Sequence, residues 1–161
     1  MDPEYVNTTL TIAAPAATVF AVLAAPSTHA AIDGTGWVQE AAEPAPLTEV
    51  GQLFRMDMYH VNHPNGYYRV VNKVHAFDPP RTIAWMTGQE KDDGELELGG
   101  WVWRYDLTEL DPAQTGVTLT YDWSAIPAYV REYLSFPPFG PDHLANSLRH
   151  LAEFVCAATG R

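Results

Sequence analysis

The chain has 161 residues, of which 47% are hydrophobic, and it carries a formal net charge of −11 at pH 7. This length suits one domain with one hydrophobic core, so we expect a single domain spanning residues 1–161. The acidic balance argues against nucleic acids and anionic membranes as partners, because both require a basic surface. No apolar run approaches the ~20 residues of a membrane-spanning helix.

The N-terminus and the cysteine content indicate a cytoplasmic protein. Residues 1–4 read Met-Asp-Pro-Glu, without the basic start and apolar core of a signal peptide. The single cysteine, Cys156, cannot form an internal disulfide. Its apolar neighbours favour a small buried side chain over a reactive thiol.

The N-terminal part of the chain predicts a strand, two helices and a second strand. Residues 5–13 alternate apolar and polar side chains, which is typical of a strand. Pro15 then favours a helix start, and residues 16–25 carry helical apolar spacing up to Pro26. We expect a second short helix to about Ile32, capped by residues 27–29, and a short strand at 37–41.

The middle of the chain predicts a run of strands joined by tight turns. Asn65-Gly66 is a strong hairpin signal, and Asp78-Pro-Pro80 turns the chain again. The charged residues 89–95 indicate an exposed loop. The expected strands are 51–60, 67–77, 81–88, 97–110 and 117–123.

Alternation assigns one face of each strand to the interior of the domain. On residues 67–77 we expect Val70, Val74 and Ala76 to face inward, while Arg69, Lys73 and His75 face water. Asp57 and Asp122 also fall on outward faces. The inward set contains many aromatic side chains and a few polar ones: Phe54, Met56, Met58, His60, Tyr68, Asn72, Trp85, Trp101, Trp103, Tyr105, Tyr121 and Trp123.

Two C-terminal segments complete the pattern. Residues 126–139 are unusually apolar for a connection; they form either a loop packed over the core or a lid at a cavity mouth. Pro127 opens a short helix there. Residues 141–158 predict an amphipathic helix, with a start signal at 140–142 and a stop at Gly160. Its apolar stripe is Leu144, Leu148, Leu151 and Val155.

The order of elements resembles the helix-grip fold of the START/Bet v 1-like superfamily, and within it the bacterial polyketide cyclase/dehydrase-like branch. Three stretches carry the resemblance: residues 12–20 with Leu23 (first strand and helix), 74–85 (the mid-sheet hairpin), and 103–110 followed by 116–120 (the last hairpin). The implied fold class is α+β, with a curved antiparallel sheet wrapped around a long C-terminal helix.

The resemblance implies a deep cavity between the sheet and the long helix that holds an apolar small molecule. The inward aromatic set, with Leu144 and Leu148 opposite, would form its walls. Five Trp and eight Tyr favour a partly open space over a dry core, since a buried indole or phenol needs a polar partner. A solid core remains the alternative.

His60 is the candidate catalytic residue, because it is the one inward side chain that titrates near neutrality. The alternative is a hydrogen-bonded, inert histidine at a strand end. The spacing of His60 and His63 does not suit a metal site in a strand-to-turn region, so we expect no metal. We also expect no cofactor, since the chain has no Gly-rich phosphate loop and no Rossmann fingerprint. His143 and His150 are expected at the surface or rim.

The sequence therefore predicts a domain that binds a hydrophobic or aromatic small molecule, lipid- or polyketide-like. Two versions remain open: a cyclase- or dehydratase-like enzyme and a non-catalytic carrier or sensor. An interaction module would require an exposed docking patch, and none is evident in the sequence.

Overall fold

The computed structural model describes residues 4–32, 38–41, 46–59, 66–91, 93–132 and 142–158. The elements in chain order are β1 (Tyr5–Ile12), α1 (Ala16–Leu23), the 3₁₀ turn η1 (Pro26–Thr28), α2 (His29–Ile32), β2 (Val38–Ala41), β3 (Leu53–Tyr59), β4 (Tyr67–Asp78), β5 (Thr82–Glu90), β6 (Leu96–Asp111), β7 (Gln114–Asp122), α3 (Ala128–Arg131) and α4 (His143–Ala158).

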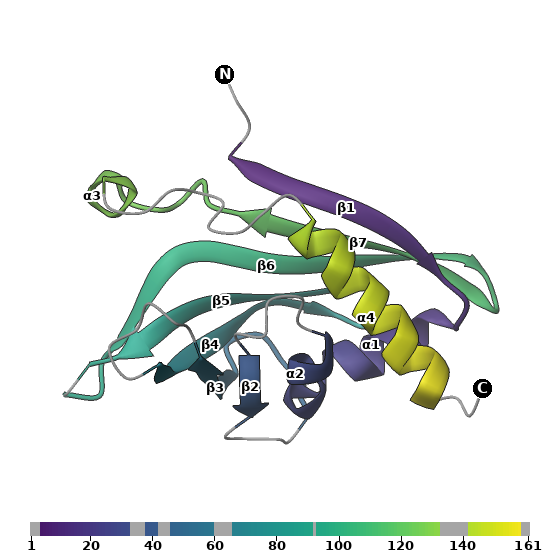
Figure 1. The fold of residues 1–161 in the computed structure, drawn as a ribbon, viewed down its shortest axis with the longest axis horizontal. Coiled ribbons are helices and arrows are strands. Elements are labelled where there is room, and N and C mark those ends of the chain that lie inside the picture. Colours follow the sequence, from purple (N-terminus) through teal and green to yellow (C-terminus); the bar gives the residue numbers. More distant parts are fainter. Residues whose placement is uncertain are drawn as a thin grey trace.

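The strands form one seven-stranded sheet in the order β1-β7-β6-β5-β4-β3-β2, with every neighbouring pair antiparallel. The sheet is curved, and α4 crosses its inner face (Figure 1). Helix α4 packs against β1, β7 and α2. The α+β class and the antiparallel sheet with a C-terminal helix are confirmed. No helix among the described residues is long and apolar enough to cross a membrane.

Helix α4 forms where the apolar stripe predicts it. The backbone N–H of Asn146 donates to the carbonyl of Asp142 at 2.9 Å, so the first helical turn starts at Asp142. The stripe faces the sheet, and each of its members is at most 4% exposed: Leu144, Leu148, Leu151 and Val155. Burying one such side chain contributes roughly 1.5–3 kcal/mol, so this face anchors the helix.

A bulge in β4 changes which side chains of its second half face the core. The register with β5 shifts between Val74 and Ala76, which places Ala76 opposite Ala84 and Phe77 opposite Ile83. Phe77 then packs edge-on against Phe20 of α1, with ring centroids 5.4 Å apart. The expectation that Ala76 continues the inward row is therefore wrong, because one extra residue in a strand reverses its alternation.

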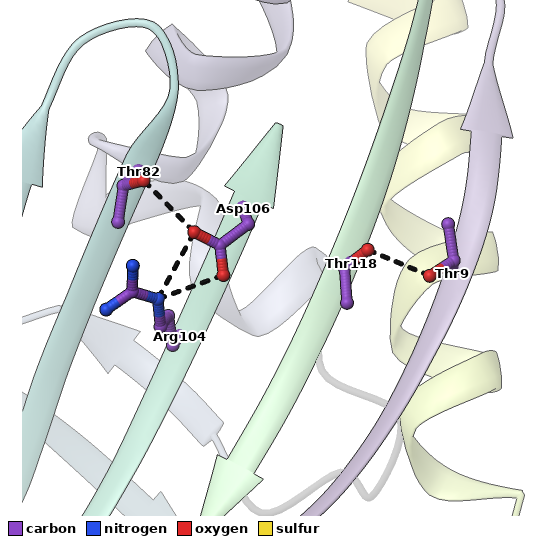
Figure 2. A network of polar contacts seen from close by, with 5 residues as sticks. All are labelled: Thr9, Thr82, Arg104, Asp106 and Thr118. Carbon is purple, nitrogen blue, oxygen red and sulfur yellow. Dashed lines mark hydrogen bonds and ion pairs between the residues drawn. The ribbon is translucent and has the colours of Figure 1, made fainter. Parts of the chain in front are cut away.

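The outer face of the sheet carries several exposed polar contacts. Thr82 Oγ1 donates to Asp106 Oδ1 at 3.0 Å, and Arg104 Nε donates to Asp106 Oδ2 at 2.9 Å (Figure 2). Arg69 pairs with Asp57 at 2.7 Å, and Lys73 and His75 are exposed, as expected. Exposed pairs of this kind each contribute only ~0–1 kcal/mol, so these contacts add little to the stability of the fold.

Candidate functional site

The inner face of the sheet is packed solid at one end. Strand alternation and the β4 bulge direct the side chains of this end against α1. Four residues of this end are at most 5% exposed, namely Phe20, Ile83, Leu107 and Val117, while Phe77 is partly buried against them. Figure 1 shows α1 at the end of the sheet where the β6–β7 hairpin turns. We call this region the packed end.

The opposite end of the inner face is only partly buried, and it is rich in aromatic rings. Its large apolar side chains touch the core cluster yet keep some exposure: Met58, Tyr68, Trp101, Trp103 and Trp123. Met58 pairs with Tyr68 on β3 and β4, and Trp103 pairs with Trp85 and Tyr121 four residues farther from the β6–β7 hairpin than Leu107 and Val117. We call these five side chains the aromatic end.

We call the remaining predicted wall residues the middle layer; Trp85 and Tyr121 of this layer lie directly opposite Trp103. The residues of the middle layer are buried and belong to one cluster: Phe54, Met56, Trp85, Tyr105, Tyr121, Leu144 and Leu148. Trp85 contacts Phe54 edge-on at 5.7 Å and Tyr105 at 5.8 Å between ring centroids. The structure therefore brings together all the described residues predicted to line the inner face. Some of these side chains are buried and others are half-exposed.

Trp101 reaches its position through an irregularity in β6. Met86 of β5 pairs with Val102, and Gly88 pairs with Leu98, so three β6 residues span one β5 residue. The Trp101 ring lies against Gly99, where a Cβ would be 2.0 Å from Trp101 Cζ3. Glycine at position 99 is thus required by the close approach of this ring.

Tyr121 links the middle layer to the aromatic end. Its ring centroid lies 4.6 Å from that of Trp103 and 5.9 Å from that of Trp123. Burial raises the pKa of the Tyr121 phenol well above its usual value of 10, because the anion would lose its hydration. Tyr121 therefore stays neutral at any physiological pH.

Asn72 is buried and already engaged across the sheet. Thr87 Oγ1 donates to Asn72 Oδ1 at 2.6 Å, from the position directly opposite on β5. The amide of Asn72 therefore lies on the inner face, as predicted. Its carbonyl oxygen is held by Thr87, which fixes the orientation of the amide.

His29, which opens α2, belongs to the inner face although the sequence analysis gave it only a capping role. The imidazole is 6% exposed and stacks on Trp85, with centroids 4.9 Å apart and planes at 17°. It also meets Phe54 edge-on at 5.6 Å. The one signal was its place as the only large polar side chain among the small and apolar residues 24–32.

The protonation of His29 follows from its surroundings. Nε2 lies 2.9 Å from the carbonyl oxygen of Leu23, and a carbonyl only accepts, so Nε2 carries the proton. Desolvation by burial lowers the pKa of His29 to about 4, against a smaller opposite effect of the Leu23 carbonyl. The ring is neutral at pH 7 and locked between a backbone carbonyl and an indole.

His143, the first residue of α4, is also buried, so its expected place at the surface or rim is wrong. The side chain is 8% exposed and its ring meets Trp103 edge-on at 5.8 Å. Ser147, one turn later on the same row, is 6% exposed. The buried face of α4 is wider than the leucine stripe alone, and this width brings His143 against the aromatic end.

Several expectations fall elsewhere. His60 and His63, and residues 133–139 of the predicted lid, lie outside the described residues. Pro127 does precede a short helix, α3, yet Tyr129 is 64% exposed there. Cys156 is half-buried rather than buried. Within the described ranges, no three His, Cys, Asp or Glu side chains gather as a metal site would require.

No family model matches the chain. It is similar to the uncharacterized protein Rv0088 of Mycobacterium tuberculosis strain H37Rv, 31% identical over 123 residues, which are 76% of this chain and 49% of that protein. The uncharacterized protein MT0096 of M. tuberculosis strain CDC 1551 matches over the same shares at 31% identity. The chain thus spans about half the length of the curated relatives it matches.

Solved structures share the fold over nearly the whole chain. Protein NE0264 of Nitrosomonas europaea has a TM-score of 0.70 at 13% identity, covering 100% of both chains. Protein Ms6760 of Mycobacterium smegmatis has a TM-score of 0.67 at 16% identity, covering 98% of this chain and 94% of that one. At such identities the likeness shows a common fold and nothing more.

Proposed function

We propose that this chain is a helix-grip domain of the START/Bet v 1-like superfamily that binds a hydrophobic or aromatic small molecule between the sheet and α4. The observation that carries the proposal is the aromatic end. Large apolar side chains on an inward face are normally buried by their own domain, as four of the five are at the packed end. Here five of them remain partly exposed.

The character of these side chains supports an apolar ligand. Covering apolar surface gains roughly 25 cal/mol per Å², and indole and phenol rings offer large rigid surfaces for it. The nearby titratable groups with shifted pKa values, Tyr121 and His29, are both neutral at pH 7. A neutral or weakly polar ligand, lipid- or polyketide-like, therefore suits the site better than an anion, which the net charge of −11 also disfavours.

A cyclase- or dehydratase-like activity would require, in addition, a base within hydrogen-bond reach of a bound carbonyl. The Nε2–H of His29 donates a hydrogen bond to the backbone carbonyl of Leu23, and the ring packs against Trp85, so His29 serves the core rather than a substrate. We keep His60 as the proposed catalytic group and a non-catalytic carrier or sensor as the alternative. The lone cysteine favours a cytoplasmic setting for either.

The test compares two variants on the same face of β6. Trp103→Leu removes an aromatic surface from the aromatic end, and Leu107→Ala removes a buried side chain from the packed end. We expect the wild type to bind the neutral dye N-phenyl-1-naphthylamine saturably, and Trp103→Leu to weaken binding roughly tenfold.

Leu107→Ala is the matched control. It should destabilise the fold by about 2–5 kcal/mol while leaving the dye affinity unchanged at temperatures where it is folded. If the wild type binds no dye, or if Leu107→Ala weakens binding as much as Trp103→Leu, the aromatic end is an ordinary part of the core and the proposal fails.

A further inference from the structure

The two edges of the sheet differ in how they are protected. Natural edge strands are usually short, charged or bulged, which prevents pairing with another chain. At one edge, β2 has four residues, carries Glu40 and shifts register between Val38 and Glu40. At the other edge, β1 has eight residues, pairs with β7 without a register shift and contains neither proline nor a side chain charged at pH 7.

The backbone hydrogen bonds show which groups of β1 point outward. The Trp123 N–H donates to the carbonyl of Glu4 at 2.9 Å, which continues the register that pairs Tyr5 with Asp122. Bonding to β7 alternates along an antiparallel strand, so the even-numbered residues of β1 face β7. The N–H and C=O groups that point to the open edge belong to Tyr5, Asn7, Thr9 and Thr11.

The side chains of these four residues lie on the outer face and are exposed. Thr9 Oγ1 forms a hydrogen bond with Thr118 Oγ1 of β7 at 2.8 Å, as Figure 2 shows. This bond holds β1 against β7, on the side away from the open edge. Among the described elements β1 packs chiefly on β7 and α4. The open edge is therefore a preformed row of backbone donors and acceptors.

We propose that two copies of this chain pair antiparallel through β1, with the twofold axis at Thr8. In this register Tyr5 lies opposite Thr11 of the second copy, and Asn7 lies opposite Thr9. Each such pair exchanges an N–H and a C=O, giving about eight backbone hydrogen bonds and using every edge group. On the inner face, half-buried Val6 meets Leu10 of the second copy.

Charge identifies a second copy as the occupant. The chain carries 20 acidic and 9 basic residues, so most self-contacts would bring carboxylates together. Within β1 no side chain is charged at pH 7, and Glu4 would face Ile12 in this register. In this register outer-face side chains meet outer-face side chains, and no two like charges face each other within β1. An isologous interface requires such a self-complementary surface. The result is one continuous sheet built from two domains.

The first test uses charge placed at the edge. In Asn7→Lys/Thr9→Lys, each new lysine lies opposite a lysine of the second copy. The control Thr118→Lys/Thr120→Lys adds the same charge on the same face one strand inward, and it removes the same Thr9–Thr118 bond. Sedimentation equilibrium should show a wild-type dimer, a dissociation constant raised roughly tenfold or more in the edge variant, and little change in the control.

The second test fixes the register by disulfide formation in a Cys156→Ser background. Thr8→Cys puts two thiols on the axis, in a non-hydrogen-bonded pair with Cα atoms about 4.5 Å apart, which suits a disulfide. Thr9→Cys puts its two thiols on a diagonal about 7–8 Å apart and should cross-link far more slowly. A monomeric wild type at the highest attainable concentration, or equal cross-linking of the two variants, would overturn the proposal.

Discussion

At the scale of single residues, His29 couples the core to pH. Its ring stacks on Trp85 and donates to the Leu23 carbonyl, an arrangement that fits the neutral imidazole. Protonation would place a charge in a buried cluster, against the rings of Phe54 and Trp85. Burial therefore favours the neutral form of the His29 imidazole in the folded protein.

The pH dependence of stability follows from the lowered pKa of His29. In the unfolded chain the group has a pKa of 6.5, and in the folded chain about 4. Between these values the unfolded state binds the extra proton, so this contribution is fully present above pH 6.5 and is lost as pH falls toward 4. The loss amounts to about 3 kcal/mol, and His29→Gln should remove it.

Urea unfolding of wild type and variants from pH 4 to pH 7 measures this contribution. The exposed His75 supplies the control, since His75→Gln keeps the histidine count equal to that of His29→Gln. The explanation is wrong if His29→Gln retains the wild-type slope of stability against pH.

His60 carries the catalytic version of the proposed function, and the prediction attached to it stands untested. If the protein is an enzyme, His60→Gln should cut turnover by about 10²–10⁴-fold while binding changes far less. The measurement is turnover of the molecule that co-purifies with the protein. Unchanged turnover would leave a carrier or sensor.

At the scale of elements, regular segments could be predicted from the sequence and irregular ones could not. The apolar stripe of α4 and the alternation of β3 gave the correct buried faces, because each follows one period throughout. The β4 bulge breaks that period at His75, so Ala76 was assigned to the wrong face. No local residue pattern predicts such a bulge, because the bulge depends on how β4 pairs with β5.

The two buried histidines were missed for a related reason. His143 precedes the leucine stripe, and only the packing of Trp103 against α4 shows that the buried face extends to it. His29 belongs to a four-residue helix, too short to display a periodic face. In both cases contacts distant in sequence, with β5 or β6, decide the burial.

Gly100 tests the irregular part of β6. Its φ is +100°, and a Cβ there would lie 2.8 Å from the carbonyl oxygen of Ala125. Gly100→Ala should therefore cost roughly 1–3 kcal/mol of stability through backbone strain, with the contact to Ala125 adding to it. Thermal or urea unfolding measures the difference.

Gly116 of β7 is the matched control. It has no positive φ, and a Cβ there meets no atom closer than 3.8 Å. Gly116→Ala should be nearly neutral by comparison. Equal destabilisation by the two substitutions would mean that the conformation at Gly100 contributes nothing special to the fold.

At the scale of the whole molecule, the domain has a packed end, where α1 closes the inner face, and an aromatic end, where five large side chains remain half-exposed. The proposal that this inner face binds an apolar small molecule comes from the resemblance to the helix-grip fold. The fold shared with the solved structures does not identify a ligand. What the ligand is depends on side chains rather than on the fold, so it must be measured on this chain.

The methionines offer the most direct measurement of the central claim. Met56 and Met58 lie on the inner face, Met58 at the aromatic end, while Met86 pairs with Lys73 and Val102 on the outer face. With ¹³C-methyl-labelled methionine, NMR titration with N-phenyl-1-naphthylamine should shift the Met58 methyl saturably and leave the Met86 methyl in place. A Met58 signal that does not move, or one that moves no more than Met86, would contradict a ligand site at the aromatic end.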